Sequence, residues 1–204
     1  ITEADIAAEK EKEGAEGFPD AYLESLALFR KLCDYVLKYG NGTIFHSSAV
    51  AVDGEAYLFT APSGTGKTTQ YRLWKMLFGN EVQMLNGDKA VLKIDECGVL
   101  VFPSPWRGKE NMGNRITAPL GGIVLLEQAA ENSISRLSPG EAAGRIYLQF
   151  MFARETTEQL LAACSLEHRL LSTAPIWLLK NRGDEESTLL CHETLEKEIF
   201  KNGV

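Results

Sequence analysis

Residues 55–79 read EAYLFTAPSGTGKTTQYRLWKMLFG and carry the strongest structural signal in the chain. An apolar strand pattern at 55–60 leads into a glycine-rich turn, and a helical pattern at 68–79 follows and ends at a glycine. The turn, residues 61–68, has the A-P-S-G-T-G-K-T form of a phosphate-binding loop, with alanine in place of the first glycine. A strand, such a loop and a helix in succession predict an α/β fold that binds a phosphorylated ligand.

The residue types of this loop fit the demands of polyphosphate binding. Backbone N–H groups must point inward, so Gly64 and Gly66 would permit a tight turn and a close approach. Lys67 would reach the β- and γ-phosphate oxygens, Thr68 would place a hydroxyl on Mg²⁺, and the next helix would add its N-terminal dipole. An ordinary glycine-rich turn is the alternative. The predicted phosphate-binding set is Ser63, Gly64, Thr65, Gly66, Lys67, Thr68 and Thr69.

Asp88 is the candidate metal ligand. It follows the short strand pattern VQML at 82–85 and stands 21 residues after Lys67. A carboxylate at a neighbouring strand end is expected to hold Mg²⁺ beside the phosphate loop, so Thr68 and Asp88 form the predicted metal site. The alternative is a plain turn, because the Asn-Gly pair before Asp88 is a common hairpin signal. The sequence has no NKxD segment of the kind that selects guanine, which argues against a GTPase.

Two further candidates lie outside these segments. His46 belongs to one expected strand, TIFHSSAVAV at 43–52, where a single histidine on an apolar face is more often a core residue than a functional one. A hairpin turn at 53–54 returns the chain to the strand before the phosphate loop. Arg107 and Lys109 flank a glycine in PSPWRGKE (103–110), where two cations would clamp a phosphate or an anionic substrate. Exposed cations in a loop are the plain alternative.

The first 40 residues differ from the rest in composition. Residues 1–17 hold six acids and two lysines, which predicts a solvated and partly mobile lead-in, although Thr2 and Asp5 could cap a short helix. Apolar residues at helical spacing predict an amphipathic helix over 20–39, ended by Gly40 in a left-handed cap. The chain begins with isoleucine, from which we expect a truncated N-terminus.

The remaining patterns mix hairpins with helices. We expect a mixed sheet and not a purely parallel one, within one compact domain that divides into residues 1–40 and a core at 41–204 with C-terminal helices. The further expected elements are strands at 90–95, 99–102, 122–127 and 175–180, a long loop at 103–119, a helix opened by a capping box at 138–141, and helices at 156–171 and 187–201.

Composition removes several function classes. The chain has 204 residues, 45% hydrophobic and 24% charged, which is typical of a globular protein. The net charge of −7 disfavours non-specific nucleic-acid binding, which needs a cationic surface. The sequence contains neither a membrane-length apolar run nor a signal segment, so we expect a cytoplasmic protein without a membrane partner. Its four cysteines form no CxxC pair and predict reduced thiols, mostly packing, and no zinc site.

These residues resemble a known family. The stretch 46–88 resembles the kinase core of HPr kinase/phosphorylase and, more distantly, of ATP-dependent phosphoenolpyruvate carboxykinase. In HPr kinases a histidine opens the strand pair that leads to a G-x-S-G-x-G-K-[ST] loop, and here His46 precedes Ala61 by 15 residues. Residues 40–180 are similar to bacterial HPr-kinase-related proteins of unassigned substrate, through HSSAVAVDGEAYLFTAPSGTGKTT, an N-[DG]-DK segment, PW-x-GKE and an I-V-L-L-E strand.

The resemblance implies a PEP carboxykinase-like P-loop fold, with a mixed curved sheet, hairpins and helices packed outside. It also implies an ATP- and Mg²⁺-dependent phosphotransferase that acts on a hydroxyl of a protein, peptide or small molecule. HPr kinases are hexamers, so a homo-oligomer is possible. The implied catalytic residues are Lys67 on the phosphates, Asp88 on the metal, Arg107 and Lys109 on the transferred charge, and His46 for proton movement.

One position departs from the family pattern. HPr kinases have a double aspartate here, the first a general base and the second a metal ligand, whereas this chain has Gly87-Asp88. A base contributes roughly 10²–10⁴-fold, so the chain could be a slow kinase in which Gly87→Asp raises phosphotransfer. The main alternative is a nucleotide-binding accessory or regulatory protein without turnover. A phosphorylase or phosphatase activity is a third reading, and carboxykinase activity needs a longer chain.

Overall fold

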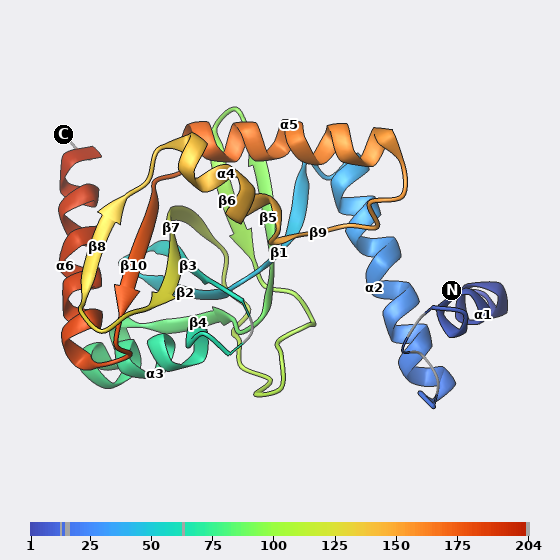
Figure 1. Ribbon diagram of the computed structural model, residues 1–204, viewed down its shortest axis with the longest axis horizontal. Coiled ribbons are helices and arrows are strands. Elements are labelled where there is room, and N and C mark those ends of the chain that lie inside the picture. Colours follow the sequence, from blue (N-terminus) through green and yellow to red (C-terminus); the bar gives the residue numbers. More distant parts are fainter. Residues whose placement is uncertain (13, 15–16, 63, 203–204) are drawn as a thin grey trace.

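The computed structural model of the chain describes residues 1–12, 14, 17–62 and 64–202, and side chains up to residue 197 (Figure 1). In chain order the elements are α1 (Glu3–Lys10), α2 (Asp20–Tyr39), β1 (Gly42–His46), β2 (Ser48–Val52), β3 (Glu55–Thr60), α3 (Lys67–Phe78), the 3₁₀ turn η1 (Gly79–Glu81), β4 (Gln83–Asn86), β5 (Lys89–Asp95), β6 (Gly98–Phe102), β7 (Ala118–Gln128), β8 (Ser133–Arg136), α4 (Pro139–Tyr147), β9 (Phe150–Met151), α5 (Thr157–Thr173), β10 (Ile176–Asn181) and α6 (Glu185–Asn202).

The strands form one ten-stranded sheet. Strands β4-β2-β3-β7-β6-β5-β1-β9 lie side by side in that order, and β10 and β8 continue from β7. Among the described pairings, β3 with β7 and β7 with β10 are parallel, and the others are antiparallel. The first residues of β7 pair with β6 and the later ones with β3 and β10, so this strand joins the two halves of the sheet. The expected mixed sheet with hairpins is confirmed.

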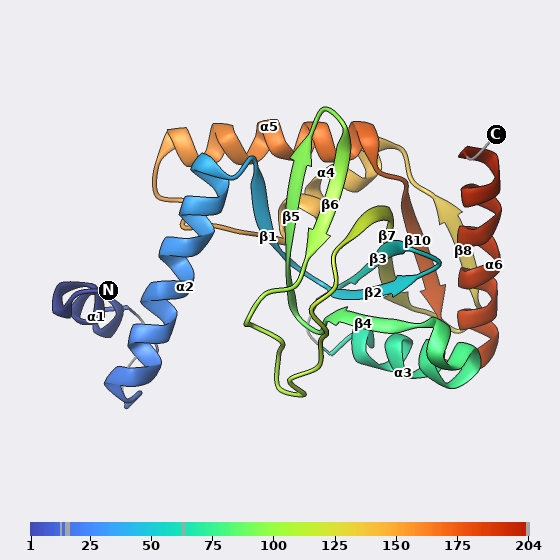
Figure 2. The same ribbon diagram turned by 180° about the vertical axis from the view of Figure 1, so that it is seen from behind.

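Helices cover both faces of the sheet (Figures 1 and 2). Helix α5 packs on β1, β5 and β6 with α4 beside it, while α3 and α6 pack on β2, β3, β7, β8 and β10. Side chains alternate along β3, so Leu58 joins one buried apolar cluster while Tyr57 and Phe59 join the other, around Trp74 of α3. The helices therefore pack outside the sheet, as expected. Among the described residues, no helix is long and apolar enough to cross a membrane.

The expected strand at 43–52 is two strands. β1 pairs with β5 and β9, whereas β2 pairs with β3 and β4, and the change of partners occurs at Ser47. The chain changes partners again between β4 and β5, at residues 87–88, and the Ser47 N–H donates to the Asp88 carbonyl at 2.9 Å. His46 therefore shares no continuous strand face with β2. We call each such change of partner a strand crossing. The crossing at Ser47 and the crossing at 87–88 lie side by side, and this brings His46 next to Asp88.

The lead-in contains a helix over residues 3–10, and most of these residues are solvent-exposed, as expected. Thr2 and Asp5 form a capping box at the start of α1. Acidic side chains of α1 then face basic ones of α2: Asp5 pairs with Lys31 at 2.7 Å, and Glu9 pairs with Arg30 at 2.9 Å. The thin apolar face of α1 is compensated by these ion pairs, which a helical periodicity does not reveal.

Helix α2 has the predicted bounds, but the residue in the left-handed conformation after it is not the predicted one. Gly40 has φ −94°, and Asn41 is the residue in the left-handed region, with φ 46°. Glycine is needed at position 40 for another reason, because a Cβ there would lie 2.8 Å from the carbonyl oxygen of Val36. Leu23 and Leu37 are buried by the helix, as its apolar pattern predicted.

The other expected elements are present, and β8 and β9 are two strands that the sequence did not predict. The turn at Asp53 and Gly54 has φ 51° and 82°, as a two-residue hairpin requires, and the Ser138–Glu141 capping box opens α4. β7 begins at Ala118, earlier than expected, because its first residues pair with β6. All four cysteines are free thiols; two are buried, whereas Cys97 and Cys164 are exposed, so packing does not account for those two.

Candidate functional site

The phosphate-loop motif lies between β3 and α3. Gly64 and Gly66 have φ 82° and 110°, in the left-handed region that favours glycine, and Lys67 is the first residue of α3. The loop is closed by Thr65, whose backbone N–H and hydroxyl both donate to the Pro62 carbonyl, at 3.3 and 2.9 Å. The first turn of a helix leaves N–H groups without intrahelical partners, so α3 offers donors at its start. Ser63 lies outside the described residues.

The Lys67 side chain folds back over the start of the loop. Its Nζ donates to the carbonyl oxygen of Ala61 at 2.8 Å and lies 3.4 Å from that of Pro62. Burial lowers the pKa of Lys67, while the negative charge of Asp88 acts in the opposite direction. The loop itself therefore holds the ammonium group at the edge of the glycine turn.

Asp88 faces this loop across the cleft as an ionised carboxylate. Burial raises its pKa, but hydrogen bonds with His46 and Lys89 outweigh burial and bring the pKa to about 2. The His46 Nε2 lies 3.3 Å from the Asp88 Oδ1, and the Lys89 ammonium contacts Oδ2. Sequence reasoning did not single out Lys89. The Asp-Lys pair at 88–89 was the available signal.

Asn86 is a second residue that the sequence reasoning missed. It is fully buried, and its Oδ1 accepts from the backbone N–H groups of Asp88 at 3.0 Å and Lys89 at 2.7 Å. Its Nδ2 donates to the carbonyl of Ser104 at 3.1 Å. One amide therefore shapes the turn that presents Asp88 and ties it to the loop at 103–117. An asparagine at a strand end that caps the next backbone groups is a recognisable turn signal.

The loop at 103–117 forms one wall of the cleft. The Gly87 N–H donates to the Met112 carbonyl at 3.0 Å, and the Asn114 Nδ2 donates to the Met84 carbonyl at 2.9 Å. The Trp106 ring packs edge-on against Phe29 of α2, with centroids 4.8 Å apart. These contacts hold the loop along β4 and against α2.

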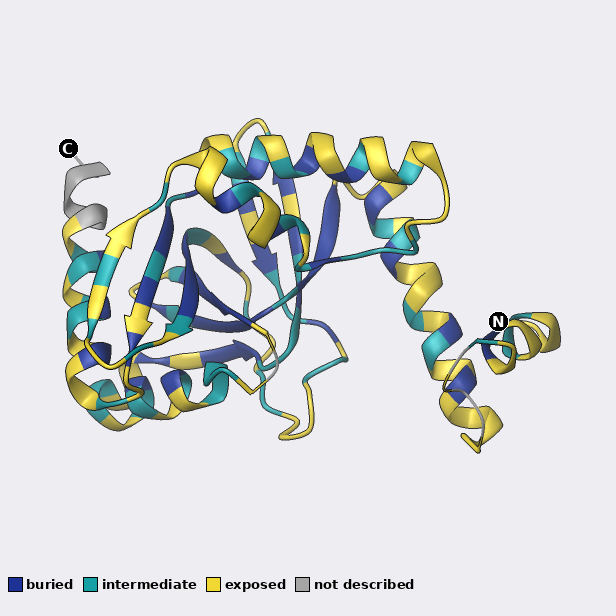
Figure 3. Cartoon of the chain, viewed as in Figure 1, coloured by how far each residue is buried: buried dark blue, intermediate teal, exposed yellow. Residues whose placement is uncertain are grey.

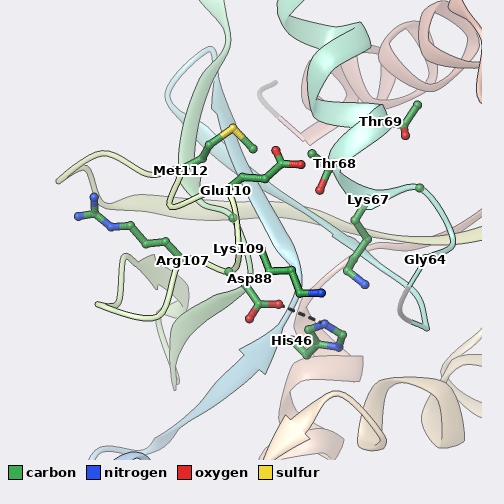
Figure 4. A pocket seen from close by; sticks show the side chains of 13 residues that line it. His46, Gly64, Lys67, Thr68, Thr69, Asp88, Arg107, Lys109, Glu110 and Met112 are labelled. Atoms are coloured by element: carbon green, nitrogen blue, oxygen red, sulfur yellow. Dashed lines mark ion pairs between the residues drawn. The ribbon is translucent and has the colours of Figure 1, made fainter. Parts of the chain in front are cut away.

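The two predicted anion clamps point in different directions. In Figure 4 the Lys109 side chain extends into the cleft, toward Asp88 and His46, whereas the Arg107 guanidinium points away from them. The Arg107 Nε would lie 3.4 Å from a Cβ on Gly113, so Arg107 runs along its own loop. Both residues line the cleft, yet only the Lys109 side chain is directed at its interior.

Position 87 has no room for a side chain. A Cβ on Gly87 would lie 2.7 Å from the Arg107 carbonyl oxygen and 3.1 Å from that of Met112. Both are backbone atoms of the packed loop, so an aspartate at position 87 would have to displace it. Gly87→Asp would therefore have to displace this loop before its carboxylate could act as a base, and its effect on phosphotransfer stays a prediction.

Three segments distant in sequence enclose a cleft of about 430 Å³ (Figure 4). They are the end of β1, the phosphate loop with the first turn of α3, and the strand crossing at 87–88 with the loop beyond it. The lining residues are His46, Gly64, Gly66, Lys67, Thr68, Thr69, Gly87, Asp88, Arg107, Gly108, Lys109, Glu110 and Met112. The predicted site residues therefore lie in one place, apart from Thr65 and the undescribed Ser63.

Asp88 and Thr68 suit a Mg²⁺ ion that is held partly by phosphate. Among the described residues, no group of three or more His, Cys, Asp or Glu side chains could hold a metal on its own. Mg²⁺ usually keeps several waters and binds through one or two carboxylates together with substrate phosphates. One ionised carboxylate and a threonine hydroxyl in the same cleft fit that donor set.

Comparisons with known proteins add a distant structural similarity. No protein-family model matches the chain, and no curated protein matches it. Among solved structures, the chain is similar to the Hpr(Ser) kinase/phosphatase from Coxiella burnetii, with 12% identity and a TM-score of 0.45, over 78% of this chain and 92% of that chain. At so low an identity and TM-score, the similarity assigns neither an activity nor residue roles.

Proposed function

We propose that this protein is an ATP- and Mg²⁺-dependent kinase that phosphorylates a hydroxyl of a protein, a peptide or a small molecule. The observation that carries the proposal is the shared cleft, in which the glycine loop with Lys67 faces His46 and the ionised Asp88. A glycine loop at a helix N-terminus is suited to phosphate, and a facing carboxylate is suited to a phosphate-bound cation.

The phosphate loop would bind and orient the triphosphate. Backbone N–H groups at residues 64–69 would donate to its oxygens, because the left-handed glycines and the first turn of α3 leave such donors available. Lys67 is held at the edge of the turn by the Ala61 carbonyl and would neutralise charge on the β- and γ-phosphates. Lys109 would add a second positive charge from the opposite wall.

Thr68 and Asp88 would hold the Mg²⁺ ion. When bound, the ion neutralises phosphate charge as the phosphoryl group transfers. The low pKa of Asp88, about 2, keeps this carboxylate charged throughout the physiological range. Lys89, which pairs with Asp88 in the structure, would have to share that carboxylate with the ion.

His46 would take the proton of the acceptor hydroxyl. Its Nε2 faces the Asp88 carboxylate at 3.3 Å, which leaves Nδ1 as the nitrogen that can accept a proton. The acceptor oxygen then bonds to the γ-phosphorus, the bond from that phosphorus to the β–γ bridging oxygen breaks, and ADP leaves. The nearby carboxylate would stabilise the imidazolium that forms.

Broader expectations accompany this proposal. The fold would be of the PEP carboxykinase-like P-loop type, with residues 41–204 as the catalytic core and residues 1–40 as an appended helical segment. The partners would be a nucleotide, a phosphoacceptor and further copies of the chain in a homo-oligomer, without nucleic acid or membrane. The protein would act in the cytoplasm. The strand–loop–helix geometry around Gly64 and Gly66, within a mixed sheet, supports the fold assignment.

A second function is favoured by one observation. The backbone of the 103–117 loop occupies the space beside Gly87, where a general-base carboxylate would otherwise lie. A protein that binds a nucleotide in this cleft without turnover, as an accessory or regulatory subunit, would tolerate that packing. The two functions differ in whether the γ-phosphate ever leaves ATP.

Calorimetric titration of Mg·ATP into the full chain tests the proposal. We expect micromolar binding that is lost in Lys67→Ala and in Asp88→Asn, and unchanged in Lys93→Ala. Lys93 is a matched control because it is half-exposed on β5 and pairs with Asp95, outside the cleft. Absence of binding by the intact chain would contradict both functions. Binding without transfer or release of labelled γ-phosphate, with any acceptor, would leave the accessory function.

A further inference from the structure

Helix α2 carries a largely apolar stripe of solvent-exposed residues. Six exposed residues follow one another at alternating spacings of four and three, the heptad spacing of a helix that packs along another helix. The exposed fractions of the four large side chains are 44% for Leu28, 36% for Leu32, 62% for Tyr35 and 66% for Tyr39. The stripe consists of Ala21, Ser25, Leu28, Leu32, Tyr35 and Tyr39.

The opposite face of α2 is the one that the fold uses. Leu23, Ala27, Cys33 and Leu37 are buried there against α1, β1 and α5. The N-terminal half of α2 projects from the rest of the molecule with α1 beside it, and exposed residues run along its outer side (Figures 1 to 3). The stripe is therefore accessible to a second helix.

We propose that this stripe binds the same stripe of a second copy of the chain, with the two α2 helices antiparallel. The two-fold axis passes between the helices level with residue 30, whose own side chain points to the other face and pairs with Glu9. In that arrangement, residues equally far from Arg30 face one another. Each large side chain toward the C-terminus then meets a small one or a leucine, as an isologous interface requires. The facing pairs are Leu28 with Leu32, Ser25 with Tyr35, and Ala21 with Tyr39.

A parallel pairing of the same stripe fits less well. It would place Tyr35 against Tyr35 and Tyr39 against Tyr39 at one end, and only small side chains at the other. Crowding at one end and gaps at the other both cost packing energy. The antiparallel register removes both defects at once, because bulk increases toward the C-terminus of the helix.

Charges beside the stripe support the same register. In the antiparallel pair, Glu24 of one copy lies opposite Lys38 of the other, and this contact occurs twice about the axis. Lys38 makes a long pair with Glu158 at 3.7 Å and lies over the Tyr39 ring at 5.5 Å. The Lys38 and Glu158 side chains are both more than half exposed, so the Lys38 ammonium is accessible to Glu24 of a second copy. The Lys31 side chains of the two copies would lie near each other at the axis. In each copy, Asp5 already balances the charge of Lys31, at 2.7 Å.

The predicted dimer is weak. The stripe spans only about three heptads, so the buried area falls toward the low end of specific interfaces, and we expect a micromolar dissociation constant. This inference does not depend on the proposed kinase activity, because every residue of the stripe lies outside the cleft.

Sedimentation equilibrium of the full chain, across the micromolar range, tests the inference. We expect the mean mass to rise from monomer toward dimer, and Leu32→Glu to raise the dissociation constant roughly 100-fold by placing two unpaired carboxylates at the axis. Leu189→Glu is the matched control, because Leu189 is an exposed leucine on α6. A monomer at all concentrations, or a dimer that Leu32→Glu leaves intact, would overturn the proposal.

A charge exchange tests the register. Glu24→Lys and Lys38→Glu should each weaken the dimer roughly fivefold, since each replaces an attraction by a repulsion at two places. The double variant restores opposite charges and should return to within about twofold of the original affinity. Additive weakening in the double variant would exclude the antiparallel register. Circular dichroism of each variant separates loss of pairing from loss of the helix.

Discussion

The two walls of the cleft are built in different ways. The phosphate-loop wall comes from one continuous stretch that holds itself, through the Lys67 contact with the Ala61 carbonyl and the Thr65 contacts with Pro62. The facing wall joins the 87–88 crossing to a loop that begins fifteen residues later, at position 103. This second wall is held by the hydrogen bond from the Gly87 N–H to the Met112 carbonyl and by the buried side-chain amide of Asn86, which donates to the Ser104 carbonyl. The first wall is therefore robust to changes elsewhere, whereas the second depends on distant contacts.

The largest expected effect comes from filling the space at Gly87. Gly87→Asp should lower the free energy of unfolding by about 3 kcal/mol, because its Cβ would lie 2.7 Å from a backbone oxygen and the loop must move. For a chain of 204 residues this corresponds to a fall in Tm of roughly 6–12 °C. Thermal unfolding followed by circular dichroism measures it.

Gly144→Asp is the matched control for this variant. Gly144 lies in α4, where a Cβ would meet nothing within 4 Å. Its Tm should change little. If Gly87→Asp unfolds at the temperature of the unsubstituted chain and also accelerates phosphotransfer, the loop yields easily, and the contrast between the two walls is lost.

The buried amide of Asn86 should have the next largest effect. Asn86→Ala removes the acceptor for two backbone N–H groups and the donor to Ser104, and should cost about 2 kcal/mol of unfolding free energy. The apparent Mg²⁺ affinity for Mg·ATP binding should fall as well, because Asp88 loses its orientation. Urea unfolding and calorimetry at several Mg²⁺ concentrations measure the two effects.

Ser104→Ala is the matched control for Asn86→Ala. This variant keeps the Ser104 carbonyl that accepts from Asn86 and removes only the hydroxyl contacts. It should cost less than about 1 kcal/mol and leave the Mg²⁺ dependence unchanged. Equal losses in both variants would mean that Asn86 anchors the loop and does not orient Asp88.

The same contrast explains which features the sequence could predict. The strand at 55–60, the turn at 53–54 and the helix at 20–39 follow from periodicity and turn chemistry, which act over a few neighbouring residues. The break between β1 and β2 at Ser47 does not follow from local patterns, because it depends on which strands lie beside β1 and β2. The ion pairs that hold α1 on α2 are likewise contacts between separate helices.

The site divides in the same way. Motif and spacing could locate a group of residues that the structure places in one cleft: Gly64, Gly66, Lys67, Thr68, Thr69 and Asp88. The direction of the Arg107 side chain could not be predicted, because it depends on how Arg107 lies against Gly113. The roles of Asn86 and Lys89 could not be predicted either, because they depend on the strand crossing at 87–88. The reason for glycine at position 87 also appears only when the loop is in place.

A pH titration examines the charge on the second wall. The folded pKa of Asp88, about 2, lies below its ordinary value of 3.8, so the carboxylate contributes stability above pH 4 that is lost as the pH falls toward 2. The contribution is at most about 2 kcal/mol. Urea unfolding of the unsubstituted chain and of Asp88→Asn should differ by a gap that narrows over this window. A constant gap would mean that Asp88 is not stabilised as a carboxylate.

The smallest expected effect is the difference in Mg·ATP affinity between substitutions of Lys109 and Arg107, the two cations of the 103–117 loop. Lys109→Ala should weaken Mg·ATP binding roughly tenfold, because its side chain extends into the cleft, whereas Arg107→Ala should weaken it by less than about threefold. Neither substitution touches the hydrogen bonds of Gly87 or Asn86, so both proteins should keep their Tm. Equal losses of affinity would mean that Arg107 turns into the cleft when nucleotide binds. The second wall would then change conformation with its ligand, while the phosphate-loop wall stays as it is.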